Sequence, residues 1–293
     1  MLLLANSRTP YRELAEKLNL SANAVHQRIQ ALIKLGIIRK FTAKISLSAL
    51  QAIIVNIYGI TEAESIGDLH EKIGKNKLVY WVAYGSGNWI YVGAYLRNLA
   101  ELQGLVDFLK KEAAMSNPTV GIFPQVPSSP VLGTERTLTP LDRQIIFSLK
   151  ENSRKPIWQV AEEIGVAAKT VRRRLSAMEK KGLVEFSIQW YADSSNDIIS
   201  VIHIRLNPDV EANSLSEMMK GFAPNVLLWF PQINIPNELF TVFWTSTMKE
   251  LKEIQQRLMN ERTVSSLTSN ILFTGYIFDT WRDDLVDPKN IGV

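Results

Sequence analysis

Hydrogen-bonding side chains recur at helical spacing in the segment from Ala22 to Leu35. The aliphatic residues of this segment that are spaced to face one way are Val25, Ile29 and Leu32. The opposite face carries donors and acceptors, namely Asn23, His26, Gln27 and Gln30. Such side chains can bind base edges when a helix enters the major groove of DNA. Ser21 is placed to cap this helix and is also a candidate DNA contact, and Arg28 at its flank suits a phosphate.

A second segment has the same spacing about 146 positions later, but its outward face is more basic. This face carries Lys169, Thr170, Arg172, Arg173 and Ser176, and Arg174 stands in the place of Arg28. These residue types again suit DNA binding, and the cations among them favour phosphate contacts more than the residues of the first helix do. The arginine run could instead be held by ion pairs to acids of the same region, which are Glu162, Glu163 and Glu179.

A basic stretch follows the first of these helices. Gly36 supplies a C-terminal cap, and Ile37 and Ile38 begin a predicted β-hairpin that runs to Ile45. Its cations are Arg39, Lys40 and Lys44, which we expect to contact phosphates. The second copy has Glu185 where the first has Arg39, so its hairpin should hold phosphate less well.

Positive charge gathers around these two helices. The whole chain has a net charge of only +4 over 293 residues. Residues 1–45, however, hold eight Lys and Arg side chains against Glu13 and Glu16, and residues 138–191 hold ten against six acids. Two separate basic blocks are the pattern expected where a protein meets nucleic acid.

Residue patterns typical of catalysis are missing from the sequence. There are no cysteines, and the three histidines, His26, His70 and His203, fall in different predicted modules. No metal-spaced cluster, nucleophile elbow or phosphate-binding loop occurs. We therefore expect a protein that is not an enzyme and has no catalytic residue, no metal and no cofactor.

The chain repeats itself. Residues 6–38 align without a gap to residues 152–184, and about a dozen of the paired positions are identical. The match opens with Asn6-Ser7-Arg8-Thr9-Pro10 against Asn152-Ser153-Arg154-Lys155-Pro156. A gapless match of this length indicates one supersecondary unit used twice. In each copy a short helix, a tight turn, a longer helix and a hairpin follow one another, which is the order of a winged helix-turn-helix.

The segment behind each copy repeats more faintly. β-Branched runs and helical spacings alternate in the order strand, helix, strand, strand, helix, strand, which predicts a ferredoxin-like domain. Between the halves, a stretch rich in Pro, Ser, Gly and Thr reads as a linker.

These features resemble the leucine-responsive regulator/AsnC (Lrp/AsnC) family of prokaryotic transcription factors. The resemblance rests on the stretch from Arg12 to Ile29, ending in Leu35-Gly36-Ile37-Ile38. It implies sequence-specific binding of double-stranded DNA, and a ferredoxin-like domain of the RAM type that senses ligands and assembles subunits. The family's Gly-x-x-Asp turn is replaced here by Gly87-Asn88-Trp89-Ile90 and, in the second copy, by residues 232–236.

The predicted architecture is α+β, with two winged helix-turn-helix domains that are each followed by a ferredoxin-like (βαββαβ) RAM-type domain. We expect a helix-turn-helix at 1–46, whose first helix is short or truncated, a ferredoxin-like domain at 47–124 and a linker at 125–137. The second helix-turn-helix is expected at 138–192, the second ferredoxin-like domain at 193–281 and a C-terminal tail at 282–293.

The predicted partners are double-stranded DNA, further copies of the chain bound through the RAM-type domains, and a small-molecule effector that the resemblance implies. The two copies could pair within one chain or between chains. No apolar run reaches the roughly 18–20 residues of a membrane span, so we expect a cytoplasmic protein without a membrane partner. Two other functions stay open: a siroheme decarboxylase, since some proteins that resemble this family have that activity, and an architectural protein that coats DNA.

Overall fold

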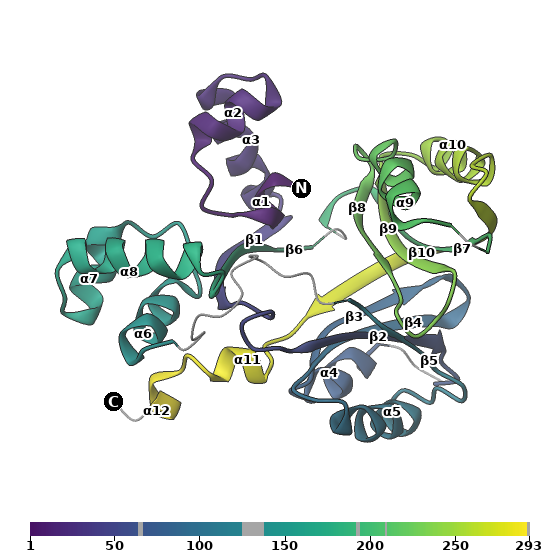
Figure 1. Ribbon diagram of the computed structural model, residues 1–293, viewed down its shortest axis with the longest axis horizontal. Coiled ribbons are helices and arrows are strands. Elements are labelled where there is room, and N and C mark those ends of the chain that lie inside the picture. Colours follow the sequence, from purple (N-terminus) through teal and green to yellow (C-terminus); the bar gives the residue numbers. More distant parts are fainter. Residues whose placement is uncertain (64–66, 125–137, 192–193, 209, 292–293) are drawn as a thin grey trace. The chain divides into compact units, whose positions relative to one another are not determined.

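The computed structural model describes residues 1–63, 67–124, 138–191, 194–208 and 210–291. The predicted linker at 125–137 lies outside these residues. The described chain forms two compact units, and each combines pieces of both copies. One, here called the HTH unit, is drawn from Met1–Ala52, Gln125–Ser194 and Asp279–Val293, and the other, the sheet unit, from Ile53–Pro124 and Ser195–Phe278 (Figure 1).

The first copy contributes three helices and a strand to the HTH unit. These are α1 (Leu2–Ala5), α2 (Tyr11–Leu18), α3 (Ala22–Lys34) and β1 (Ile38–Ile45). Asn19 ends α2 in the left-handed conformation at φ 53°, which asparagine tolerates, and so turns the chain sharply towards α3. The Ser21 hydroxyl accepts a hydrogen bond from the amide of Ala24 at 3.1 Å, which confirms Ser21 as the cap of α3.

The second copy contributes α6 (Pro140–Leu149), α7 (Ile157–Ile164), α8 (Ala168–Lys180) and β6 (Val184–Trp190). Thr139 and Asp142 form a capping box that begins α6. Gly165, at φ 69°, makes the left-handed turn after α7 that Asn19 makes in the first copy. The helix-turn-helix predicted for each copy is therefore confirmed.

The two strands that follow the recognition helices pair with each other. β1 runs antiparallel to β6, with Phe41 opposite Ile188 and Ile45 opposite Val184. The prediction of a separate hairpin from Ile37 to Ile45 is wrong, because this run forms one continuous strand whose ladder partner comes from the other copy. Each strand also packs against a helix of the other copy, because α6 lies on β1 and α1 lies on β6.

The end of the chain returns to the HTH unit. Residues 282–293, expected as a tail, instead begin inside helix α11 (Trp281–Asp284), and α12 (Pro288–Ile291) follows. Trp281, Arg282 and Asp283 are buried, and a Thr280–Asp283 capping box starts α11. The prediction failed because burial of Trp281 and the ion pairs of its two charged neighbours fix this segment.

The sheet unit contains two ferredoxin-like halves. The first consists of β2 (Ile53–Ile60), α4 (Leu69–Gly74), β3 (Val79–Gly85), β4 (Trp89–Leu96), α5 (Ala100–Glu112) and β5 (Thr119–Ile122), with a 3-10 turn, η1 (Ser86–Asn88), before β4. The second consists of β7 (Ile198–Leu206), α9 (Ala212–Lys220), β8 (Val226–Pro231), β9 (Glu238–Thr245), α10 (Met248–Met259) and β10 (Val264–Ile277). The predicted α+β class and element order are confirmed.

One eight-stranded sheet joins the halves in the order β5-β2-β4-β3-β10-β7-β9-β8. The long strand β10 makes the junction, because its first part pairs with β7 and its last residues pair with β3. Each half buries one sheet face under its own helices in a separate apolar core. Both the β1–β6 and the β3–β10 ladders thus pair the two copies within one chain. None of the helices in the described residues is long and apolar enough to cross a membrane.

Candidate nucleic-acid interface

Helix α3 has one buried face and one polar face, as the sequence predicts. Val25 and Ile29 are 2% and 4% exposed and pack with Leu14 and Ala15 of α2. The predicted base-reading side chains Asn23, His26, Gln27 and Gln30 are all exposed, as is Arg28. His26 also makes an edge contact with Tyr11 of α2, at 5.3 Å between ring centroids. Four hydrogen-bonding groups therefore lie together on a helix whose opposite face is fixed.

Helix α8 presents a basic counterpart. Its buried seam consists of Val171, Leu175 and Met178. On the outer face Lys169, Arg172 and Arg173 are exposed, whereas Thr170 and Ser176 are half-buried. The two helices therefore hold equivalent places in the repeat but carry different chemistry: amides and an imidazole on α3, and cations on α8.

Arg174 is engaged inside the protein. Its Nε donates to Asp142 Oδ1 at 2.8 Å, its Nη2 binds the other carboxylate oxygen, and Nη2 also donates to the Thr139 hydroxyl. Asp142 is 1% exposed. Burial alone would raise the pKa of Asp142, but the bonds from Arg174 and Thr139 outweigh it and hold that pKa below its usual value. Arg174 therefore positions α8 on α6 with its charge balanced inside the protein, and its predicted phosphate contact stays a prediction.

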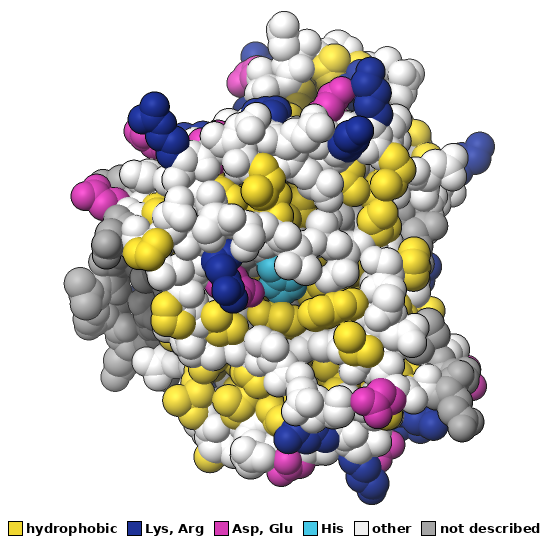
Figure 2. Space-filling view, turned by 90° about the vertical axis from the view of Figure 1, so that its right-hand side faces the viewer, with side chains coloured by type: hydrophobic (Ala, Val, Ile, Leu, Met, Phe, Trp, Pro, Cys, Tyr) yellow, Lys and Arg dark blue, Asp and Glu magenta, His cyan; other side chains and the backbone are white. Residues whose placement is uncertain are grey.

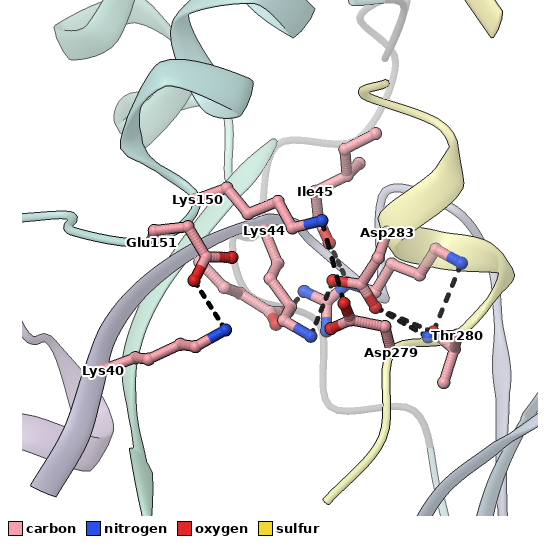
Figure 3. Close-up of polar contacts among 10 residues, drawn as sticks. Lys40, Lys44, Ile45, Lys150, Glu151, Asp279, Thr280 and Asp283 are labelled. Atoms are coloured by element: carbon pink, nitrogen blue, oxygen red, sulfur yellow. Dashed lines mark hydrogen bonds and ion pairs between the residues drawn. The ribbon is translucent and has the colours of Figure 1, made fainter. Parts of the chain in front are cut away.

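The cations of β1 also have partners (Figure 3). Lys40 Nζ lies 2.6 Å from a carboxylate oxygen of Glu151, and this hydrogen bond raises the pKa of Lys40. Lys44 Nζ lies 2.7 Å from Asp283 Oδ1. Arg39 is exposed, with its guanidinium 3.6 Å from the ring centroid of Tyr191. Of the three predicted phosphate contacts on this strand, only Arg39 is exposed and has no carboxylate partner among the residues that the structure describes.

A buried ion-pair group holds β1, β6 and α11 together, and sequence reasoning missed it. Arg282 donates to the carbonyl of Ile45 and to Glu185, while Lys44 binds Asp283. Burial raises the pKa of Asp283, yet the charge of Lys44, its hydrogen bond and that of Thr280 bring the pKa below its usual value. The sequence does contain one signal that a helix begins in this segment. Thr280 and Asp283 have the spacing of a capping box, which contradicts a structureless tail.

A second polar cluster lies in the sheet unit. His203 of β7 has its Nδ1 3.0 Å from Glu238 Oε1 and its Nε2 3.4 Å from the Tyr91 hydroxyl. Tyr58 donates to the same Glu238 oxygen at 3.1 Å, and Asn270 donates to Tyr91 at 2.6 Å. The hydrogen bond from His203 lowers the pKa of Glu238, and burial raises those of Tyr58 and Tyr91.

Aromatic rings enclose this cluster. Tyr58 lies 4.6 Å from the His203 ring and is flanked by Trp89 and Phe240. Figure 2 shows a face on which apolar side chains surround a hollow, with a histidine at its floor and an acidic and a basic group beside it. Within the described part of the chain, no group of three or more His, Asp or Glu residues could hold a metal ion.

Comparison with known proteins matches the two helix-turn-helices. A family model described as winged helix-turn-helix DNA-binding matches residues 2–39 and 138–185. An uncharacterized HTH-type transcriptional regulator of Pyrococcus horikoshii is 33% identical over 36% of this chain and 72% of that protein. The HTH-type transcriptional regulator LrpA of the same organism is 34% identical over 30% of this chain and 62% of its own length.

The solved structures add a likeness along the whole chain. The siroheme decarboxylase NirDL matches with a TM-score of 0.63 over 99% of this chain and 96% of that one, at 12% identity. The same protein in complex with an iron-uroporphyrin III analogue matches with a TM-score of 0.60. The likeness shows a shared fold, and the fold is one that an enzyme has. The expectation of a protein that is not an enzyme is thereby corrected, because it relied on sequence motifs that this fold does not require.

The helix-turn-helix model matches once in each copy, and a regulator of the same type shares a third of its residues over most of its own length. This chain therefore belongs to the Lrp/AsnC family of HTH-type transcriptional regulators.

Proposed function

We propose that this chain is a transcription regulator that binds double-stranded DNA through both of its helix-turn-helices, with α3 reading base edges through amides and α8 binding both phosphates and guanine edges through its cations. The observation that carries the proposal is the exposed row of Asn23, His26, Gln27 and Gln30 above the buried Val25–Ile29 seam. A helix with a fixed inner face and hydrogen-bonding groups on its outer face can enter the major groove with its side chains already in place.

The residue types on α3 suit base recognition. Asn and Gln amides can donate to and accept from one adenine edge at the same time, which makes them selective among base pairs. His26 adds a donor or acceptor beside them. The Ser21 cap leaves the first turn of α3 well defined, and this turn is the part of a recognition helix that reaches deepest.

Helix α8 supplies charge, and its arginines can also bind guanine edges. Lys169, Arg172 and Arg173 are exposed, and Arg28 and Arg39 add exposed cations in the first copy. Because Lys40, Lys44 and Arg174 have carboxylate partners within the protein, these five cations dominate the phosphate contacts. Five contacts give a plot of log affinity against log salt with a slope of about −4 to −5.

A gel-shift titration at several salt concentrations tests the proposal. Duplexes from the organism's own promoters should bind, with the slope given above, and competitor DNA of unrelated sequence should displace the protein poorly. Binding that ignores the competitor's sequence would instead indicate an architectural protein. A chain that binds no duplex at low salt would contradict both forms of the proposal.

A second candidate function is siroheme decarboxylation. Its support is the fold shared with NirDL together with the His203, Glu238 and Tyr91 cluster, since a buried histidine held by a carboxylate can transfer protons. Siroheme added to the protein should then shift its absorption spectrum and be decarboxylated, and His203→Leu should abolish the decarboxylation while His26→Leu, in the HTH unit, leaves it unchanged. An unaltered spectrum with the wild-type protein would eliminate this candidate.

A further inference from the structure

The best-matched part of the internal repeat lies at a junction between the two copies. Ser7 and Ser153 are 146 positions apart, which is the repeat shift, and their hydroxyls meet at 2.7 Å. Both residues are fully buried. Contact between equivalent residues means that a local two-fold axis relates the two copies at this point.

The neighbouring contacts are reciprocal. The guanidinium of Arg8 donates to the Ser153 carbonyl, and Arg154 Nη2 donates to the Thr9 carbonyl at 2.8 Å. In the same way the Ser7 amide donates to the carbonyl of Phe186 on β6, and the Ser153 amide to the carbonyl of Phe41 on β1. Each turn therefore binds the other copy's turn and the other copy's strand.

The side chains before and after the serines also repeat their roles. Asn6 accepts the Arg8 amide at 2.9 Å, and Asn152 accepts the Arg154 amide at 3.0 Å, so each asparagine shapes its own turn. The Arg8 guanidinium lies over the ring of Phe186, and that of Arg154 over the ring of Phe41. We call the two turns, residues 6–8 and 152–154, the Asn-Ser-Arg clasp.

The position of the clasp in the chain gives it a consequence for DNA binding. The turns lead directly into α2 and α7, the first helices of the two helix-turn-helices. At the other end of each module, α3 and α8 lead into β1 and β6, which are paired. Each module is thus fixed to its counterpart at its entry and at its exit, so α3 and α8 are held as parts of one body.

We propose that the Asn-Ser-Arg clasp is a positioning element that fixes the separation and phase of α3 and α8, and so sets the half-site spacing that a single chain accepts on DNA. The inference rests on the proposed function for its DNA part. Half-sites read by two modules of one rigid body must lie at a defined separation, near one helical turn of about 10–10.5 bp or a multiple of it.

The geometric part can be tested without DNA. Because the chain has no cysteine, Lys34→Cys on α3 and Lys180→Cys on α8 give two unique sites for spin labels, and both lysines are exposed. The distance distribution between the labels should be narrow in the intact chain. It should broaden at least about twofold when Arg8→Ala and Arg154→Ala are combined, and broaden less with the milder pair Ser7→Ala and Ser153→Ala.

The DNA part uses duplexes whose two half-sites are separated in steps of one base pair. The intact chain should prefer one spacing by about tenfold over its neighbours, and the clasp variants should prefer it by less than about threefold. Arg12→Ala, an arginine of α2 that is exposed and lies outside the clasp, is the matched control and should behave as the wild type. Circular dichroism identifies the variants that remain folded, and the serine pair provides a test if the arginine pair unfolds.

The possible outcomes separate the two proposals. A folded clasp variant that keeps both the narrow distance distribution and the spacing preference would overturn the inference. A wild type with a narrow distribution that binds no duplex would contradict the proposed function and the half-site part of the inference, while the clasp would keep its role in positioning the helices.

Discussion

Arg174 of α8 binds both carboxylate oxygens of Asp142 of α6, and Asp142 also completes the capping box that starts its own helix. The equivalent residue of the first copy, Arg28, is exposed, and the first helix of that copy, α1, consists of apolar residues only. This repeat position therefore stabilises the second copy, whereas in the first copy it is exposed, and its contact with DNA stays a prediction.

Arg174→Ala should lower the free energy of unfolding by about 2–3 kcal/mol, because it leaves the buried Asp142 without its cation. Urea titration followed by circular dichroism measures this. Arg172→Ala on the exposed face of the same helix is the control, and its effect should stay within about 0.5 kcal/mol. Equal decreases in the free energy of unfolding for the two variants would show that the Arg174–Asp142 ion pair stabilises the protein no more than an exposed arginine does.

Arg28→Ala should act on DNA affinity and leave stability nearly unchanged. Loss of one phosphate contact should weaken binding to all sequences alike and reduce the salt slope by about 0.9. Gel shifts at three salt concentrations give both quantities. An unchanged slope would mean that Arg28 does not meet the backbone.

Substitution of Lys40 and substitution of Gln27 should have different effects on DNA binding. Lys40 is paired with Glu151, so Lys40→Ala should change affinity by less than about twofold for any sequence. Gln27→Ala should instead relax the preference at one base position by about 1–3 kcal/mol. Competition between single-base variants of one duplex measures the preference. A general loss of affinity in the Lys40 variant would restore the phosphate contact that the sequence predicted for this strand.

The free energy of unfolding should decrease at acidic pH because Asp283 and Asp142 become protonated. Both carboxylates have a pKa below its usual value in the folded protein, so the unfolded chain binds more protons as the pH falls. Their stabilising contribution is present above about pH 4–5 and decreases as the pH falls towards the folded pKa. Urea unfolding at pH 7 and pH 3 should therefore give a smaller difference for Asp283→Asn than for the wild type. Asp287→Asn, further along the same segment, should keep the wild-type difference.

The helices of the two helix-turn-helices could be predicted because their signals are local. The spacing of Val25 and Ile29 within one helix, the cap at Ser21 and the glycine after the helix all lie within a few turns of each other. The order of strands and helices likewise indicated the ferredoxin-like halves. The family assignment from the stretch between Arg12 and Ile29 is confirmed by the comparisons.

The contacts that determine which cations are available could not be predicted, because they join residues far apart in the chain. Lys44 meets Asp283, Arg282 meets Glu185 and Lys40 meets Glu151 only after β1 and β6 pair and the C-terminal segment folds back. The pattern of β1 fits a hairpin strand as well as a strand that pairs with the other copy. The DNA-contacting roles of the residues on α3 and α8 stay predictions, and their exposure is what now supports them.

Selection of bound duplexes from a random library tests the central claim most directly. The wild-type chain should enrich one composite site with a well-defined half-site, and combined Asn23→Ala and Gln27→Ala substitutions on α3 should erase the base preference of that half-site while binding persists. Enrichment of no sequence by the wild type, or the same enriched site with the α3 variant, would contradict base reading by this helix.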